Sequence, residues 1–364
     1  MQATRLAPLY STLAAVAFIG GTAGLAHAQS SVTVYGLLDT GIVHESGGKA
    51  GPVTGLASGI AAGSRLGFRG VEDLGGGLSA LFLIESGIQI DTGGLGQGNL
   101  FGGRQTYVGL KSQVGTVTAG LQYTPYYLVV AFADPFVSGL AGKSTAIMAS
   151  SGTRMDNTVK YRTPTLAGFT GEAAYRFGET AGSASRNSAH GATLSYANGP
   201  LDVRLAHHSK NIYTVSSGTA PLRDSDARNT MLAGTYDFTV AKAYLAYAVN
   251  KGFGSSPFLV ANPYGATEAP AASTDSRDMI VGVSVPYGAS TYLASYIRKD
   301  DRDAANRDAS KWAVGYFYAL SPRTSLYASY SAIRNTNGAA YTVATAIESG
   351  TGDKASNIGI THSF

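Results

Sequence analysis

The chain has 364 residues, of which only 14% are charged, carries a formal net charge of +4 and contains no cysteine. Soluble proteins usually carry about a quarter charged residues, and a positive charge this dilute argues against a nucleic-acid-binding protein. Without cysteine no disulfide can stabilise the fold, so hydrogen-bonded secondary structure must hold it.

The N-terminus, residues 1–28, is expected to be a secretory signal peptide. A single arginine precedes an apolar stretch at 13–19, and the small-residue end at 26–28 is typical of cleavage before Gln29. A permanent membrane anchor is the alternative, but this stretch is too short to cross about 30 Å of hydrocarbon. We therefore expect export through the Sec pathway and a single β-domain over 29–364.

Alternation of apolar and polar residues recurs along the exported chain and predicts β-strands. In the segment 169–177, Phe169 and Tyr175 share one side, whereas Glu172 and Arg176 share the other. The same pattern recurs at 201–206, 311–318 and 324–331. In a soluble sandwich the apolar side would face the core, but in a membrane barrel it faces lipid and the polar side faces a water-filled lumen. Alternation alone does not decide between the two.

The spacing of the connections favours the membrane barrel. Short turns alternate with long polar or glycine-rich loops, as in outer-membrane barrels with tight periplasmic turns and long external loops. The short turns are expected at 74–77, near Gly115, and at 165–168, 198–201, 238–240, 286–290 and 320–323. The long loops are expected at 44–60, 91–101, 124–153, 179–187, 212–229, 251–274, 300–308 and 335–353. Seven turns and eight loops predict an all-β fold, a sixteen-stranded antiparallel transmembrane β-barrel.

Two further features agree with a closed barrel. The longest apolar segment of the exported chain, 126–133, is too short for a transmembrane helix. At the C-terminus, Ile358, Ile360 and Phe364 share one face of the last expected strand, and the chain stops on the aromatic ring.

Several segments resemble the beta-proteobacterial branch of the Gram-negative general porins. Ser31–Gly41 is similar to the first strand of that branch, and Ser64–Leu78 to its second strand, first turn and entry to the third. Tyr107–Lys111 and Gly115–Thr118 are similar to its fourth and fifth strands. The resemblance covers the whole exported chain, and the joined motifs are more specific than any one of them.

The resemblance implies a homotrimeric channel of the cell outer membrane, surrounded by its lipid, for passive diffusion of small hydrophilic solutes and ions. It also implies that the third loop, 124–153, folds inward and forms a constriction in which loop acids face wall arginines. Asp134 lies in a segment similar to the family's loop, and Arg65 and Arg154 match its wall arginines. The terminal residues Ile358, Ile360 and Phe364 would form the signal for the barrel assembly machinery.

Alternation places further charged residues in the lumen. Arg65 and Arg69 share one face, and Arg154, Lys160 and Arg162 share another, opposite Met155, Val159 and Tyr161. Cations in a narrow channel raise the local anion concentration, so we expect a weak preference for anions. The alternative is that these residues are ordinary solvated lumen charges. Asp39 and Glu85 also fall on polar faces and are expected to pair with wall cations, which would hold the arginines in place.

One position departs from the family pattern. Porins of this branch commonly carry an arginine at the end of the fifth strand, where this sequence has Leu121. Alternation places Leu121 toward lipid, so an inward arginine there would require a bulge near Gly120. The missing charge should weaken the anion preference or widen the constriction. The apolar stretch 126–132 either packs the loop against the wall or forms an aromatic path for a preferred solute.

Other classes of function are disfavoured or remain open. A barrel enzyme would need a Ser/His or Asp/His constellation, but the sequence holds six histidines without a visible catalytic partner and no G-x-S-x-G or H-E-x-x-H motif. We therefore expect no enzyme, no metal and no cofactor. A structural or adhesive barrel would be favoured if the third loop failed to enter the lumen or if a plug sealed it. A channel dedicated to one sugar or aromatic acid stays open as an alternative.

Overall fold

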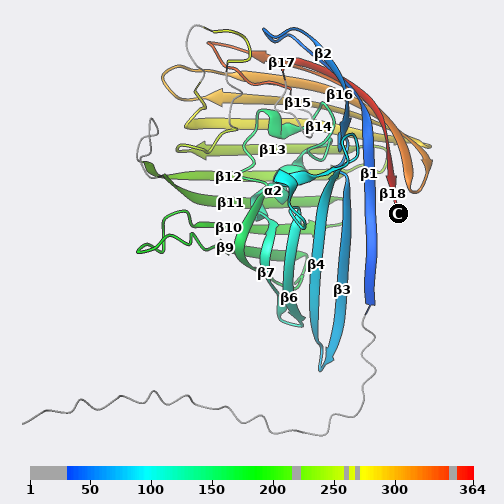
Figure 1. Ribbon diagram of the computed structural model, residues 1–364, viewed down its shortest axis with the longest axis vertical. Helices are drawn as coiled ribbons and strands as arrows, with labels where there is room; N and C mark the ends of the chain where they lie inside the picture. The colour runs from blue at the N-terminus through cyan, green and yellow to red at the C-terminus, as the bar shows by residue number, and fades with distance from the viewer. Residues whose placement is uncertain (1–30, 215–222, 258–261, 267–270, 344–350) are drawn as a thin grey trace, which may run out of the picture.

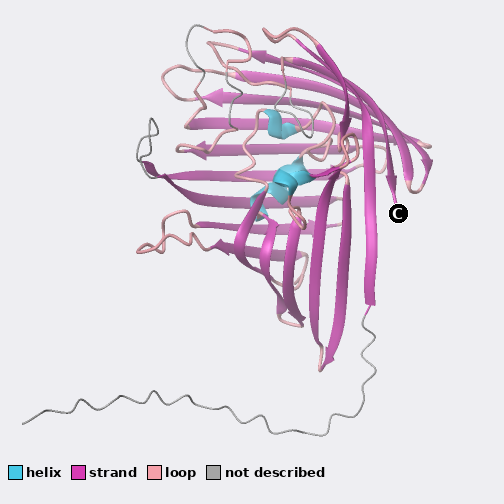
Figure 2. Ribbon diagram, in the orientation of Figure 1, coloured by secondary structure: helices cyan, strands magenta, loops and turns pink. Residues whose placement is uncertain are grey.

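The computed structural model describes residues 31–214, 223–257, 262–266, 271–343 and 351–364, so the expected signal peptide, 1–28, lies outside them. Figures 1 and 2 show strands that wrap around into one barrel, with short helical segments on the inner side. The wall strands are β1 (Ser31–Ser46), β3 (Arg65–Gly75), β4 (Leu78–Gln89), β6 (Gln105–Ser112), β7 (Gly115–Tyr123), β8 (Arg154–Arg162), β9 (Phe169–Arg176), β10 (Ala189–Asn198), β11 (Leu201–Thr214), β12 (Arg223–Asp237), β13 (Lys242–Lys251), β14 (Asp275–Tyr287), β15 (Ser290–Asp301), β16 (Ala309–Ser321), β17 (Thr324–Asn335) and β18 (Lys354–Ser363). Within the loops lie β2 (Val53–Ser58), β5 (Gly94–Leu95), α1 (Gly96–Asn99), α2 (Pro125–Ala133) and the 3-10 segment η1 (Ser144–Ala146).

The sixteen wall strands close on themselves, as the sequence predicts. Consecutive wall strands pair antiparallel, and β1 closes the ring against β18 in a register that runs from Leu37↔Ser363 to Ser46↔Lys354. Closure leaves no strand with an unpaired edge. Inside a bilayer this is required, because every backbone N–H and C=O group must be hydrogen-bonded. Among the described residues, no helix combines the length and apolar character needed to cross a membrane.

The connections follow the predicted alternation of short turns and long loops. Seven turns of a few residues join strands at one end, and the long connections lie at the other end. One predicted loop is shorter than expected, because β11 continues to Thr214 and β12 begins at Arg223. Polar side chains stabilise this extension across the strands, since the Asn211 amide donates to Asp224 at 2.8 Å. Because these strand ends are polar, they lack the alternation of apolar and polar residues from which the strands were predicted.

The outer face of the barrel is apolar and the inner face is polar, again as predicted. On β1, Val34, Leu38 and Ile42 are exposed on the outside, whereas Tyr35 and Asp39 point inward. The chain ends on the outer face, where Phe364 exchanges two backbone hydrogen bonds with Gly36. The Phe364 ring covers Gly36 so closely that a Cβ there would lie 2.2 Å from it. Ile358 and Ile360 share this outer face, and their role in assembly stays a prediction.

The third loop, 124–153, folds into the barrel and begins with α2 (Figure 1). The Thr124 hydroxyl accepts the Tyr127 amide at 3.1 Å, and proline occupies the first helical turn, which are favourable helix-start features. One face of α2 is buried against small inward side chains of β11 to β13. The contacting sets are Tyr126, Val129, Val130 and Ala133 from the helix and Ala206, Met231, Ala233, Ala246 and Ala248 from the wall. Packing of the apolar stretch against the wall is therefore confirmed.

Candidate pore constriction

The inner wall of β3, β4 and β6 is organised around one carboxylate, Glu85. One of its oxygens accepts from Arg104 Nε at 2.8 Å, and the other accepts from the Tyr35 hydroxyl at 2.9 Å. Arg65 Nε lies 3.8 Å from the second oxygen, and the Arg65 side chain keeps 26% of its surface exposed. Charge-assisted hydrogen bonds of this kind are about twice as strong as neutral ones. The expectation that Glu85 pairs with wall cations is confirmed.

A tyrosine links the guanidinium groups at the end of this wall. The Tyr123 hydroxyl accepts from Arg104 Nη2 at 2.8 Å and from Arg154 Nη2 at 3.1 Å. The Arg154 guanidinium also lies 4.7 Å from the centre of the Tyr123 ring, which stacks on Tyr127 at 5.3 Å. Arg65, Arg104 and Arg154 thus form one connected group, which we call the arginine cluster.

Arg104 is a member of the cluster that the sequence analysis missed. It directly precedes β6 and is not within a strand, so alternation assigns it no face. Its neighbour Gln105 pairs with Glu85 across the sheet, which places Arg104 beside that carboxylate. Gly63 leaves room for the side chain, since a Cβ there would lie 2.5 Å from Arg104 Nη1. The sequence offered one signal for this residue. A charged residue directly precedes a strand whose first residue pairs with an inward carboxylate.

A cavity of about 900 Å³ lies between the arginine cluster and the segment 135–139 of the third loop. All three arginines line it, together with Tyr123 and Tyr127. The opposite lining comes from the loop segment 135–139, which carries no charged side chain, and from Lys143. The cluster therefore faces a neutral or cationic loop and no carboxylate from it.

The prediction that Asp134 forms the acidic side of the constriction is wrong. Its side chain is fully buried and accepts the backbone amides of Phe136 at 2.9 Å, Ser138 at 3.2 Å and Ser144 at 2.7 Å. Burial raises the pKa of this carboxyl, and the hydrogen bonds from Ser144 and Phe136 together with the Lys311 ammonium oppose that rise. Asp134 organises the loop from within and does not contact the channel.

The bonds to Asp134 fix an unusual backbone in the neighbouring segment. Val137, Ser138 and Leu140 all adopt left-handed conformations, with φ of 50°, 59° and 54°. Such conformations are unfavourable for residues other than glycine and persist only where the surroundings enforce them. One consequence is that the Val137 side chain is 67% exposed and forms a neutral tip of the loop.

Asp39 is also placed differently from the prediction. It is fully buried and accepts the amides of Ile60 at 2.6 Å and Ala61 at 3.2 Å, as well as the Tyr327 hydroxyl at 3.0 Å. Within the described residues no cation lies within ion-pair distance of it. The first loop folds over this inward position, so the carboxylate binds loop backbone and holds no wall arginine.

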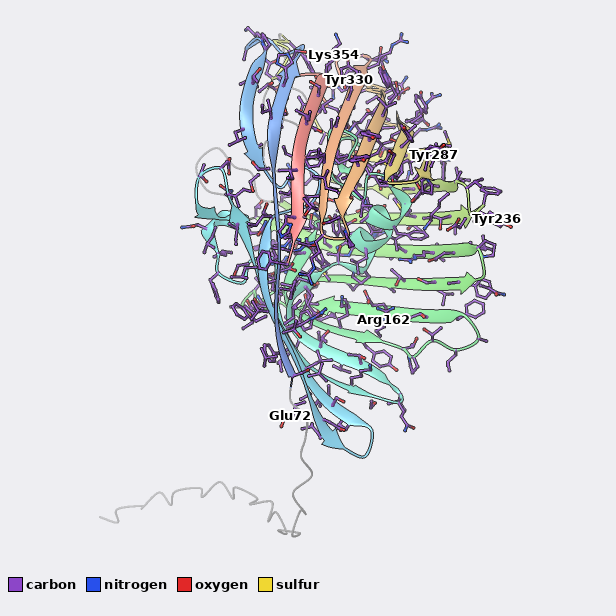
Figure 3. All side chains as sticks on the ribbon, turned by 90° about the vertical axis from the view of Figure 1, so that its right-hand side faces the viewer. Glu72, Arg162, Tyr236, Tyr287, Tyr330 and Lys354 are labelled. Carbon is purple, nitrogen blue, oxygen red and sulfur yellow. The ribbon has the colours of Figure 1, made fainter. Side chains whose placement is uncertain are left out.

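Three predicted cations lie on the inner face but outside the arginine cluster. The Arg69 guanidinium lies 5.3 Å from the Tyr35 ring centre, and Lys160 Nζ lies 3.5 Å from Glu172. Arg162 pairs with a residue beside a short turn, at the opposite end of β8 from Arg154, and Figure 3 labels it there. Arg69 and Arg162 line the wall toward the short-turn end, whereas Lys160 Nζ also lies 3.5 Å from the Tyr123 carbonyl and so reaches the arginine cluster. A role for these three cations in the constriction stays a prediction.

A bulge does occur beside Leu121, but on the neighbouring strand. The register between β7 and β8 passes from Gly120↔Thr158 to Gln122↔Met155, so β8 contains the extra residue. On β7 the alternation continues, because Gln122 bonds the inward Thr118 at 2.6 Å. Leu121 therefore stays on the outer face, as expected. Met155 instead turns inward and packs against Ala174 and Ala189, which contradicts its expected outward position.

The electrostatic balance of the site depends on few residues. The loop 124–153 contains one acid, the buried Asp134, and one lysine, Lys143. Burial lowers the pKa of Lys143 to about 8, although the nearby Glu45 opposes the shift. Among the described residues, no group of three or more His, Asp or Glu side chains is arranged to hold a metal ion.

Comparison with known proteins gives consistent similarities. The family model for Gram-negative porins matches residues 12–338. An outer membrane porin protein of Bordetella pertussis is 33% identical over 89% of this chain and 94% of that protein. Outer membrane porin protein 32 of Delftia acidovorans is 29% identical over 94% of this chain and 96% of that protein. An anion-selective porin from Comamonas acidovorans has a similar structure, with a TM-score of 0.73 and 25% identity over 92% of this chain and all of that one.

Proposed function

This chain belongs to the Gram-negative porin family, and from that premise we propose that the arginine cluster makes it a diffusion channel with a preference for anions. Its relatives are outer membrane porins, and this chain is an outer-membrane channel that small hydrophilic solutes cross passively. A structural relative is described as anion-selective, and the residues of this chain give a physical reason for the same preference.

The carrying observation is the unequal charge on the two sides of the cavity. Of the three guanidinium groups on one side, two pair with the single carboxylate Glu85, and the facing loop segment 135–139 supplies no acid. Cations lining a narrow aqueous passage between low-dielectric walls attract anions and repel cations. Arg104 adds a charge that the sequence analysis did not include, so the loss of an arginine at Leu121 weakens the preference less than expected.

The test is a planar-bilayer recording of the purified channel in a KCl gradient. We expect discrete openings with a reversal potential of the sign set by chloride. A reversal potential of the cation sign would contradict the anion preference, whereas the absence of openings after verified insertion would contradict the channel itself.

We also propose that the channel is a homotrimer whose subunits meet through one sector of the outer face. Exposed tyrosines and the tryptophan lie on β8, β9 and β12 to β16. Aromatic side chains of this kind form belts at both edges of a lipid-facing surface. Over the described parts of β18, β1, β3, β4 and β6 the exposed large side chains are mostly aliphatic, such as Val34, Ile42, Val108 and Ile358. Mass measurement of the native channel in detergent tests this, and a monomeric mass would contradict it.

No catalytic role is proposed. His44, His207 and His362 each share a hydrogen bond of 2.8 Å with a threonine on a neighbouring strand, which is a structural cross-strand pair. We propose that the terminal strand with Phe364 is the part that the barrel assembly machinery reads, because its aromatic end closes the ring on the outer face.

A further inference from the structure

A group of arginines lies on the outer face of the barrel at the long-loop end. Arg277 is on β14, Arg298 on β15 and Arg334 on β17, and all three are exposed. Arg298 and Arg334 both pair with Ser310, which lies between them on β16, so the three residues share one row and one face. Strands lie about 4.8 Å apart, which puts the two arginine backbones about 10 Å apart. Arg277 lies on the diagonal from Arg298, because it pairs with the residue two positions farther along β15.

Aromatic side chains lie directly next to this row, on the side toward the membrane. Tyr296 pairs with Trp312, and the rings of Trp312 and Tyr330 lie 5.3 Å apart. Tyrosine and tryptophan prefer the boundary between hydrocarbon and headgroups. Since long loops mark the external end of such barrels, the arginines lie at the level of the headgroups of the outer leaflet. In Figure 3, Tyr330 and Lys354 are labelled near one end of the barrel, and Tyr236 and Tyr287 near the short turns at the other.

The protein itself neutralises this group only in part. Arg298 has one ion pair, with Asp308 at 3.8 Å. Within the described residues Arg277 and Arg334 have no carboxylate within 4.0 Å, and Arg277 reaches only the Tyr247 hydroxyl at 3.5 Å. The nearby Asp300 is paired with Arg302 at 3.2 Å. Lys354 on β18 pairs with Ala332, two positions before Arg334 on β17, and adds a further exposed cation nearby.

We propose that Arg277, Arg298 and Arg334 bind the phosphate groups of a phosphorylated glycolipid headgroup in the outer leaflet. Guanidinium groups bind phosphate oxygens through two parallel hydrogen bonds, which suits this ligand better than a point charge would. The spacing of about 10 Å across β16 suits one headgroup that carries two phosphates. The adjoining aromatic side chains would contact the acyl chains and sugars of the same lipid. The site is on the outer wall and is separate from solute passage through the lumen.

The single tryptophan of the chain provides the measurement. Trp312 lies two residues after Ser310, so its ring environment changes when a lipid occupies the row. The purified channel in zwitterionic micelles is titrated with diphosphorylated lipid A while Trp312 fluorescence is recorded. We expect a saturable change for the native protein. Each cation near an anionic headgroup contributes roughly a fivefold gain in binding, so the variant Arg277→Gln, Arg298→Gln, Arg334→Gln should bind about 100-fold more weakly.

Matched controls separate this site from general attraction. Arg228→Gln removes an outer-face arginine that is already paired with Asp226 at 3.2 Å, and it should bind like the native protein. Native protein titrated with dephosphorylated lipid A should show no saturable change in Trp312 fluorescence. This control uses only the native protein, so it holds even if the triple variant does not fold. Millimolar inorganic phosphate should compete only weakly. Equal binding of the dephosphorylated lipid, or native-like binding by the folded triple variant, would overturn the proposal.

Discussion

Two ion pairs on opposite parts of the inner wall have nearly the same N–O distance but differ in their access to the lumen. Arg104 Nε lies 2.8 Å from Glu85, and Lys299 Nζ lies 2.7 Å from Asp278. The first pair is buried as well, but it borders the open cavity, and the neighbouring Arg65 keeps 26% of its side chain exposed there. Lys299 and Asp278 are both fully buried, because the third loop and parts of the later loops cover them. Coverage by loops, and not residue type or strand face, therefore decides whether an inward charge can act on a solute.

The covering residues fasten the end of the third loop. The Ala149 amide donates to Asp278 at 3.4 Å, and the Ser151 hydroxyl donates to Asn229 at 2.5 Å. Asn229 in turn donates to Asn250, which donates to Asp278 at 2.9 Å. This network ties the loop to β12, β13 and β14, while the arginine cluster remains accessible on the other side.

Removal of one charge from the covered pair is expected to have the largest effect. Lys299→Met leaves Asp278 buried without its cation, and breaking a buried pair in this way costs about 3–5 kcal/mol. We expect the free energy of unfolding, measured by denaturant titration of the folded band on unheated gels, to fall by this amount. The double variant Lys299→Met, Asp278→Leu should recover most of the loss, because no unpaired charge remains. A single variant as stable as the native protein would show that the pair is solvated.

The next largest effect tests whether Asp134 is buried within the loop or lies in the channel. In Asp134→Asn one amide oxygen replaces two carboxylate oxygens, so at least one of three backbone donors loses its partner, at a cost of about 1–3 kcal/mol. We expect lower stability and an unchanged reversal potential in the bilayer. A marked rise in anion preference would instead place this carboxylate in the channel.

The sequence predicts the frame of the molecule well, for a physical reason. Strand alternation and turn spacing follow from the requirement that lipid-facing residues be apolar and backbone groups be paired. That requirement acts on every strand, so the sixteen strands, the outward Leu121 and the inward Arg65 could all be predicted. Glu85 was predictable as a partner of wall cations because both its position and theirs lie within regular strands.

The site was less predictable because loops have no such periodicity. Arg104 precedes a strand, and Asp134 and Asp39 are covered by backbone amides of loops whose course the sequence does not reveal. The turned Met155 follows from a bulge in β8 that has no clear sequence signature. Resemblance to a family placed an acid on the third loop, but it could not show that this acid is buried.

A smaller effect is expected from changes in the arginine cluster, which borders the open cavity. The double variant Arg65→Ala, Arg154→Ala removes two charges from the cavity lining and leaves the Arg104–Glu85 pair intact. A unit charge acts on an ion at 4 Å with about 1 kcal/mol in water, which is roughly fivefold for each charge. Screening by salt reduces this effect, so removal of the two charges should lower the anion-to-cation permeability ratio about tenfold. Reversal potentials in a salt gradient measure this ratio. Arg162→Ala, at the short-turn end of β8, is the matched single-charge comparison, and an unchanged ratio in it would place Arg162 outside the constriction. No shift in the double variant would place both arginines away from the narrow passage.

The smallest effect concerns Lys143, the one cation on the loop side of the cavity. Because burial lowers its pKa to about 8, it is mostly charged at pH 7 and mostly neutral at pH 9. Glu45 and the Lys311 ammonium, which donates to the Lys143 carbonyl at 2.7 Å, are its charged neighbours. The wall arginines stay charged over this range, so the anion preference should decrease by about twofold or less from pH 7 to pH 9, given screening by salt. In Lys143→Arg the cation persists, and the reversal potential should then change less with pH. An equal change in both proteins would assign the titration to another group and leave the loop side without influence on selectivity.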